Sequence, residues 1–336
     1  MATTINRQLL LARRPEGLVE DSTIEQAEQE TPELADGQVL VRVELLSIDP
    51  ATRPWMDDAE GGYLPPIELG EVVRSAGIGE VVASRAPDMP VGQRVFGMVG
   101  WQEYAALDAA ALTPVADGVA SPQALNLFGI SGMTAYFGLL DVGRIKEGDG
   151  VLVSGAAGAT GSVAGQLARA KGAKKVVGIA GTAEKCSWLT DELGFDAAIN
   201  YKLDDVAARL DEEFPDGIDV YFDNVGGELL DDVLARIANN ARVVLSGAIS
   251  VYIDRGNVAP LRNHINMLGR PSSMGGLLVL DYAARFPEAQ VELAGLAASG
   301  AIQTRDHIVD GLENAPEALN MLFTGANTGK VMVRVR

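Results

Sequence analysis

A short apolar strand followed by a glycine-rich turn and a helical stretch is the feature that most constrains this chain. The strand Val151–Ser154 leads directly into Gly155-Ala-Ala-Gly-Ala-Thr-Gly161, and a helical pattern follows. Aligned with G-x-G-x-x-G, Ala156 takes the first glycine position, and Gly158 and Gly161 take the second and third. In such a turn, the second glycine admits a pyrophosphate and the third lets the helix pack closely on the strand. The pattern therefore favours a dinucleotide site at the helix start over a turn that is glycine-rich only for tight packing.

Four more strands alternate with helical stretches after this turn. The helix after the turn runs to about Lys171, and a second helical stretch spans residues 183–193. The additional strands are expected at 176–180, 197–200, 218–222 and 241–246. This alternation predicts a parallel sheet built from right-handed βαβ units.

The first third of the chain has a different pattern. Proline is frequent there, and it is absent between Gln123 and Phe214. Short strands with alternating or apolar residues are expected at 38–46, 78–83 and 94–99, which predicts a small, mostly β domain. The pattern changes near Asn126, and a last strand at 330–335 is expected to return to the first domain.

Charge and composition exclude several classes of protein. The 336 residues include 27 Lys and Arg and 46 Asp and Glu, which gives a net charge of −19 and argues against a nucleic-acid surface. No apolar run approaches the length of a membrane span, and the N-terminus lacks a signal-peptide core. Cys186 is the one cysteine, and there are two histidines, so we expect no disulfide framework and no metal site. A cytoplasmic protein is expected.

The residues after the second strand of the parallel sheet bear on which dinucleotide is bound. An NAD site usually has Asp or Glu at this point, for the adenosine ribose. Here the strand ends Gly178-Ile-Ala-Gly-Thr182, and the next residues include Lys185. The missing acid and the nearby cation favour NADP(H) over NAD(H), although Lys185 could also be a solvated helix residue.

Polar residues also end the fourth and fifth strands. Asn224 follows the strand 218–222, and Ser246-Gly-Ala-Ile-Ser250 follows the strand 241–246. Because the carboxyl ends of parallel strands face the ligand crevice, both segments are candidates for cofactor contacts. The alternative for Asn224 is that it caps the next helix.

Several motifs together resemble the zinc-independent medium-chain dehydrogenase/reductases. The closest branch contains leukotriene-B hydroxydehydrogenase/prostaglandin reductases, plant alkenal double-bond reductases and bacterial curcumin reductase. The segments that carry the resemblance are 49–56, 92–104, 129–140, 178–186, 221–228 and 311–318. The resemblance runs from about residue 38 to the C-terminus.

The resemblance implies an α/β fold of two domains and a set of cofactor contacts. A GroES-like domain would comprise residues 1–125 and 301–336, and a doubly wound Rossmann domain residues 126–300. The implied contacts to NADP(H) are Thr134, Gly158, Ala159, Thr160, Gly161, Ser162, Lys185, Tyr201, Asn224, Ser246, Gly247, Ala248, Ile249, Ser250, Tyr252, Leu277, Leu278, Val279 and Asn327. A homodimer is also implied, paired through the sheet edge around Ser272–Leu280.

The activity that the resemblance implies is NADPH-dependent reduction of the C=C bond of α,β-unsaturated aldehydes and ketones. Tyr252 and Tyr63 are the candidates for orienting the carbonyl or protonating the α-carbon, with simple packing as the alternative for each. Arg53 could attract anionic substrates or form a structural ion pair. The motif around Ala51 and the segment around Leu277 lack aromatic residues usual in the branch, so the resemblance implies no particular substrate.

Two other functions stay open from the sequence. The same scaffold could serve a quinone reductase or a zinc-free alcohol dehydrogenase or carbonyl reductase. A cofactor-binding protein without turnover is the alternative outside enzymes.

Overall fold

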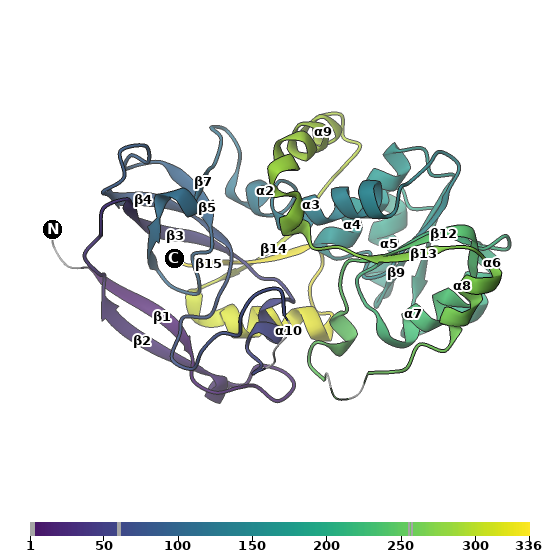
Figure 1. The fold of residues 1–336 in the computed structure, drawn as a ribbon, viewed down its shortest axis with the longest axis horizontal. Helices are drawn as coiled ribbons and strands as arrows, with labels where there is room; N and C mark the ends of the chain where they lie inside the picture. Colours follow the sequence, from purple (N-terminus) through teal and green to yellow (C-terminus); the bar gives the residue numbers. More distant parts are fainter. Residues whose placement is uncertain (1–3, 59–61, 255, 257) are drawn as a thin grey trace. The chain divides into compact units, whose positions relative to one another are not determined.

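The chain folds into two compact units, each built from segments that are separate in the sequence (Figure 1). The computed structural model describes residues 4–58, 62–254, 256 and 258–336. Unit 1 contains the chain up to Leu125, with Asp306–Asn327 and Val331–Arg336. Unit 2 contains Asn126–Arg305 and Thr328–Lys330. The middle of the chain therefore builds one unit, and both ends of the chain build the other.

Unit 1 is a mostly β structure, as the sequence predicts. Its strands are β1 (Ile5–Leu11), β2 (Ile24–Glu30), β3 (Gln38–Ser47), β4 (Gly77–Ser84), β5 (Arg94–Gly97), β6 (Tyr104–Asp108), β7 (Thr113–Pro114), β14 (Asp306–Asp310) and β15 (Lys330–Arg334). β1 and β2 form a hairpin, and the larger sheet has the order β14-β15-β3-β4-β5-β7, with β6 paired to β3. The last strand of the chain pairs antiparallel with β3, so its predicted return to the first domain is confirmed.

The core of unit 1 follows from the alternation in β3. Val39, Val41 and Val43 are all buried, and they pack in one cluster with Trp101. The same cluster includes residues of α10, which buries Ala315 and Leu319. The helices of unit 1 are α1 (Thr52–Trp55), α2 (Ser121–Leu125) and α10 (Ala315–Thr324).

Unit 2 contains a parallel sheet of six strands in the order β10-β9-β8-β11-β12-β13. The strands are β8 (Gly150–Val153), β9 (Lys175–Ala180), β10 (Ala197–Asn200), β11 (Ile218–Asp223), β12 (Ile237–Leu245) and β13 (Ser273–Gly276). Every neighbouring pair in this sheet is parallel. The sheet runs outward in both directions from β8, so the strand order reverses beside the glycine-rich turn.

Helices cover both faces of this sheet, because its strands are apolar on both sides. Val151 and Val153 of β8 belong to one core cluster, and Leu152 between them belongs to another. The first cluster packs under α3, α4 and α9, and the second packs under α6 and α7 (Figure 1). The helices are α3 (Ile130–Phe137), α4 (Ala159–Ala170), α5 (Ala183–Ser187), α6 (Val206–Glu213), α7 (Gly227–Leu234), α8 (Asn266–Gly269) and α9 (Phe286–Ala298).

Two predicted elements of unit 2 differ in detail. The stretch expected as one helix over 183–193 is α5 followed by a π-helical turn, Trp188–Glu192. β12 begins at Ile237, before the expected residue 241. The early part was missed because Asn239 and Asn240, which are polar and exposed, interrupt the apolar run, and Asn240 has a φ of +62°, a conformation that asparagine tolerates.

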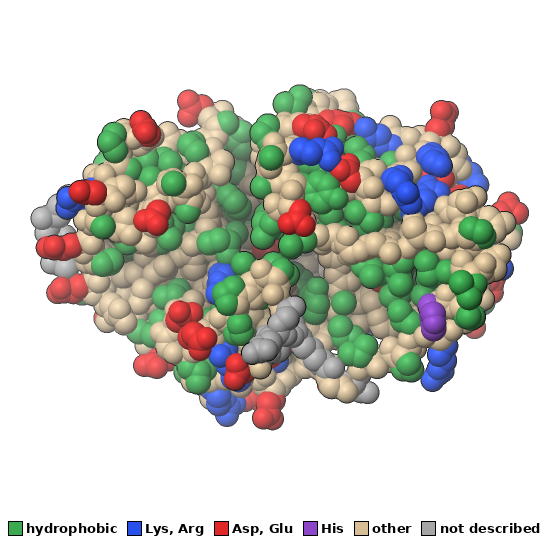
Figure 2. All heavy atoms as spheres, viewed as in Figure 1, with side chains coloured by type: hydrophobic (Ala, Val, Ile, Leu, Met, Phe, Trp, Pro, Cys, Tyr) green, Lys and Arg blue, Asp and Glu red, His purple; other side chains and the backbone are tan. Residues whose placement is uncertain are grey.

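The surface agrees with an acidic protein. On the face shown in Figure 2, Asp and Glu side chains are spread over both units, and Lys and Arg side chains lie among them. Among the residues described, no helix is long and apolar enough to cross a membrane.

Candidate functional site

The glycine-rich turn joins β8 to α4 in unit 2, and each of three glycines has a separate steric role. Gly155 has a φ of +56°, which allows the sharp turn after the strand. A Cβ on Gly161 would lie 2.5 Å from the Gly155 carbonyl oxygen and 2.8 Å from Ala156 Cα, so only glycine allows this packing. A Cβ on Gly158 would meet only the Gly155 oxygen, at 3.2 Å. Gly155 therefore allows the sharp turn, and Gly161 allows the close helix packing that the sequence predicts.

The start of α4 is suited to an anion. Its N-cap is Gly158, which provides no side-chain cap, so α4 begins with backbone N–H groups that no capping side chain occupies. Ser162 is buried, and its hydroxyl donates to the Ala159 oxygen at 3.2 Å. Thr160 lies in the first turn of the same helix. These residues fit a pyrophosphate because the turn combines free N–H donors with close backbone approach.

A segment far away in the sequence fixes this turn. Gly329 N–H donates to the Ala157 oxygen at 2.8 Å, and Gly158 and Gly329 form a parallel bridge. Lys330 N–H donates to the Arg305 oxygen at 2.9 Å. Asn327, which is buried in unit 1, immediately precedes this segment in the chain.

Basic residues follow β9 and β10, next to each other in the sheet. Thr182 caps α5 by accepting the Lys185 N–H at 3.2 Å. Burial lowers the pKa of the Lys185 ammonium, and the nearby charge of Lys202 lowers it further. The Lys202 Nζ is 5.8 Å from the centre of the Tyr201 ring. Sequence reasoning named Lys185 and Tyr201 but missed Lys202, although it is adjacent to Tyr201.

The Tyr201 ring occupies a position that depends on a glycine. A Cβ on Gly181 would lie 2.8 Å from Tyr201 Cε1. Tyr201 is also half exposed, so its ring is accessible beside the two lysines. Two cations and a phenol suit a phosphate monoester such as the 2′-phosphate of NADP(H).

A buried carboxylate organises the loop after β11. Asp223 is fully buried and accepts hydrogen bonds from the Ser154 hydroxyl at 2.8 Å, the Tyr221 hydroxyl at 2.7 Å and the Gly226 N–H at 3.0 Å. Asn224 Nδ2 donates to the Ser154 oxygen at 2.7 Å. The N-cap of α7 is Gly226, without a side-chain cap, so Asn224 joins two strand ends and does not cap that helix.

The loop after β12 folds over this position. The backbone N–H groups of Ser246 and Gly247 both donate to the backbone carbonyl oxygen of Asp223. Ile249 donates to Asn224, and Ser250 donates its hydroxyl to the Val225 oxygen at 2.6 Å. The loop therefore lies beside Asn224, as the parallel order of β11 and β12 requires.

Tyr252 closes this loop. Its hydroxyl oxygen accepts the Ala248 N–H at 3.1 Å. This bond fixes the oxygen and leaves the phenolic proton to be donated elsewhere.

The remaining predicted contacts of unit 2 lie on α3 and after β13. Leu277 N–H donates to the Leu245 oxygen at 3.1 Å, which continues the pairing of β13 with β12. Val279 is buried in the core, and Leu278 precedes it. Thr134 is the partly exposed position in an otherwise buried stretch of α3.

Two predicted residues of unit 1 have different environments. Tyr63 is exposed, and its ring meets the ring of Trp55 edge-on, with 5.9 Å between centres. Arg53 is buried and forms an ion pair with Asp57. Arg53 also donates to the Gly17 oxygen at 2.7 Å, so the structure assigns it the structural role rather than attraction of substrate.

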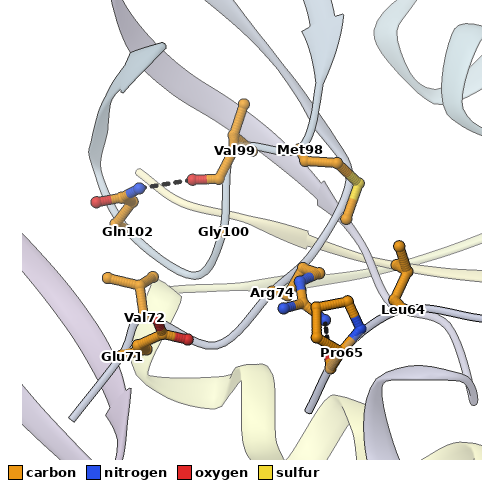
Figure 3. A pocket seen from close by; sticks show the side chains of 9 residues that line it. All are labelled: Leu64, Pro65, Glu71, Val72, Arg74, Met98, Val99, Gly100 and Gln102. Carbon is orange, nitrogen blue, oxygen red and sulfur yellow. Dashed lines mark hydrogen bonds between the residues drawn. The ribbon is translucent and has the colours of Figure 1, made fainter. Parts of the chain in front are cut away.

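Unit 1 also has a pocket of about 550 Å³ (Figure 3). One of its lining residues, Leu64, directly follows Tyr63 in the sequence. It is lined by Leu64, Pro65, Glu71, Val72, Arg74, Met98, Val99, Gly100 and Gln102. Sequence reasoning did not identify this pocket, because its lining comes from two loops that are separate in the sequence, one before β4 and one after β5. No group of three or more metal-ligating side chains occurs among the described parts of either unit.

The sequence matches known oxidoreductases along nearly its full length. Residues 7–115 match the family described as "N-terminal domain of oxidoreductase", and residues 159–289 match "Zinc-binding dehydrogenase". The protein YfmJ of Bacillus subtilis is 41% identical over 99% of this chain and 98% of its own. The NADPH-dependent curcumin reductase of Escherichia coli is 38% identical over 98% of this chain and 97% of its own. The NADP⁺-dependent 2-alkenal reductase of Nicotiana tabacum is 35% identical over the same shares.

A solved structure has the same fold. CurA from Vibrio vulnificus in complex with NADPH has a TM-score of 0.93 and 37% identity, over 98% of this chain and 99% of that chain. The chain is therefore an NADP-dependent oxidoreductase of two units, one mostly β and one Rossmann-like. It belongs to the zinc-independent branch of the medium-chain dehydrogenase/reductase family.

Proposed function

We propose that this protein reduces the C=C bond of α,β-unsaturated aldehydes and ketones with NADPH. When bound, NADPH supplies the hydride that the β-carbon of the substrate receives. The observation that carries the choice of cofactor is the pair Lys185 and Lys202, with Tyr201 beside them and no carboxylate at the end of β9.

Most of the residues that would hold the cofactor follow the carboxyl ends of strands in unit 2. Gly158, Ala159, Thr160, Gly161 and Ser162 would hold the pyrophosphate at the start of α4. Lys185, Lys202 and Tyr201 would bind the 2′-phosphate. The contacts toward the nicotinamide would come from Thr134, Asn224, Ser246–Ser250, Tyr252, Leu277–Val279 and Asn327.

Tyr252 is the proposed donor to the substrate carbonyl. In the reduction of an enone, the carbonyl oxygen gains negative charge as the β-carbon is reduced. The Tyr252 oxygen already accepts the Ala248 N–H, and this bond polarises its own O–H for donation. A donor fixed in advance stabilises that charge without reorganising during the reaction.

Tyr63 is the second proposed substrate residue. Its ring is held against Trp55 while half of its surface remains exposed, which suits contact with a small molecule. Like Tyr252, Tyr63 is proposed to orient the carbonyl of the substrate.

An isotope experiment tests the reaction. With NADPH deuterated at C4 of the nicotinamide, the label should appear at the β-carbon of a saturated ketone product. A label on the carbonyl carbon of an allylic alcohol would replace this proposal with carbonyl reduction. Parallel assays with an enone, a quinone and a plain ketone separate the other enzyme classes, and no NADPH oxidation in any of them would favour a binding protein.

We also propose a homodimer that acts in the cytoplasm. The edge strand β13 has one neighbour in its sheet, and exposed apolar side chains of unit 2 include Val258, Ile265, Leu268 and Leu280. An open strand edge with apolar neighbours favours pairing with a second copy. A monomer mass by light scattering at micromolar protein would refute the dimer.

A further inference from the structure

We propose that the pocket beside Tyr63 binds a carboxylate at the far end of the substrate, through Arg74. This inference rests on the proposed reduction of enones and enals, and it specifies their class: α,β-unsaturated carbonyl compounds with a remote carboxylate on an aliphatic chain. The residues in question are those of unit 1 that line the pocket in Figure 3.

The backbone around Arg74 is held on both sides. Val73 N–H donates to the Leu9 oxygen at 3.0 Å, and Trp101 N–H donates to the Val73 oxygen at 2.8 Å. Val73 and Ser75 are buried, whereas Val72 and Arg74 line the pocket. This alternation is that of an extended segment, and it fixes the direction in which Arg74 projects.

The Arg74 guanidinium is oriented by uncharged groups. Its Nη1 donates to the Pro65 oxygen at 2.9 Å, and its Cζ lies 5.5 Å from the centre of the Trp55 ring. Within the described part of the chain, no carboxylate lies close enough to form an ion pair with it. In a chain of net charge −19, a half-buried arginine oriented without an acid retains donors for an external carboxylate.

The walls of the pocket suit the aliphatic part of such a ligand. Leu64, Pro65, Val72 and Met98 provide apolar surface, and a volume of about 550 Å³ accommodates a small molecule. Glu71 also lines the pocket and would repel an anion at its end. The hydrogen bond to the Pro65 oxygen places the Arg74 guanidinium at the Pro65 side of the pocket (Figure 3).

The pocket is connected to the proposed reaction through Trp55 and Tyr63. Trp55 contacts Arg74 by one interaction and the Tyr63 ring by another. Leu64, next to Tyr63 in the chain, lines the pocket. A substrate whose carbonyl is near Tyr63 could therefore extend its aliphatic chain along Leu64 toward Arg74.

The test compares 9-oxodec-7-enoic acid with its methyl ester as substrates. Arg74→Met should lower kcat/KM for the acid by about 10- to 100-fold, mainly through KM, because a charged hydrogen-bonded pair is lost. The same variant should leave kcat/KM for the ester within about twofold. Arg74→Lys should fall between, because lysine keeps the charge but lacks the planar fork.

Arg85→Met is the matched control. It removes the same charge from an exposed arginine of unit 1 that pairs with Asp36 and does not line the pocket, so the ratio of acid to ester should not change. Thermal unfolding of all variants checks their folding. Equal losses for acid and ester in Arg74→Met would show that Arg74 only supports the loop, and no loss for either would also overturn the proposal.

A binding measurement separates this inference from the proposed reaction. The saturated 9-oxodecanoic acid needs no turnover, and calorimetry should show weaker binding to Arg74→Met than to the wild type. If neither substrate is reduced but this difference is found, the proposed reaction fails and the carboxylate site stands. Equal affinity of the two proteins for the saturated acid would refute the site whatever the reaction.

Discussion

Gly158 and Gly161 of the β8–α4 turn should respond differently to alanine, because a new methyl group on each would lie at a different distance from the Gly155 oxygen. In Gly161→Ala the new methyl group would lie 2.5 Å from the Gly155 oxygen, and this backbone atom cannot rotate away. Such overpacking costs about 1–3 kcal/mol, and alanine returns up to about 1 kcal/mol through its helix propensity. For a chain of 336 residues, the expected net loss of about 1–2 kcal/mol corresponds to a fall in Tm of roughly 1–3 °C.

The cofactor response should separate Gly161 from its neighbours on α4. In Gly161→Ala, the helix start must move away from the turn that would hold the pyrophosphate, so Kd for NADPH should rise by about tenfold or more. Gly165→Ala is the matched control, since its methyl group would lie 2.0 Å from Phe195 Cζ, on the core side of the same helix. That variant should lose comparable stability while Kd for NADPH changes by less than about threefold.

Gly158→Ala should have little effect on stability but should weaken NADPH binding. Gly158 has a φ of −85°, and its Cβ would have one close neighbour, at 3.2 Å, so the loss of stability should stay below about 1 kcal/mol. The methyl group would nevertheless stand where the backbone is expected to approach the pyrophosphate, and NADPH affinity should fall. Fluorescence titration and thermal unfolding without ligand measure both quantities. Normal affinity in Gly161→Ala, or a loss in Gly165→Ala equal to that in Gly161→Ala, would refute the steric argument.

Four other predictions concern single side chains. Lys185→Ala should raise KM for NADPH far more than KM for NADH, since only NADPH carries the 2′-phosphate; equal effects would contradict the assignment. Tyr252→Phe should lower kcat and kcat/KM together by on the order of 10²-fold, whereas near-normal rates would indicate packing alone. Cys186→Ser should keep most of kcat, and a large loss with normal folding would place the chemistry elsewhere. Glu103 is buried, which by itself raises its pKa, but hydrogen bonds from Arg336 and Arg7 outweigh this and lower the pKa to about 2. Glu103 should therefore stabilise the fold above about pH 4.5 and lose this effect as the pH falls toward about 2, so the stability difference between wild type and Glu103→Gln should narrow over that range; a constant difference would contradict this.

The sequence alone was sufficient for the class of fold and the type of cofactor. Period-two and apolar runs identify strands because side-chain direction follows from local backbone geometry, and the turn after Val153 is recognisable because glycine spacing is a local property. The preference for NADP(H) followed from the missing acid after β9 and from Lys185. The homology to known reductases agrees with the predicted family and cofactor.

Tertiary structure decided the features that depend on residues far apart in the chain. The pairing of Gly329 with Ala157 joins segments more than 150 residues apart, and no local pattern encodes it. Lys202 became part of the basic site because β10 lies beside β9, and Arg53 became structural because its guanidinium reaches Gly17 and Asp57. The neighbours of a side chain depend on which strands and loops the whole fold brings together. The sequence could therefore identify candidate residues, but only the packed chain determined which groups they contact.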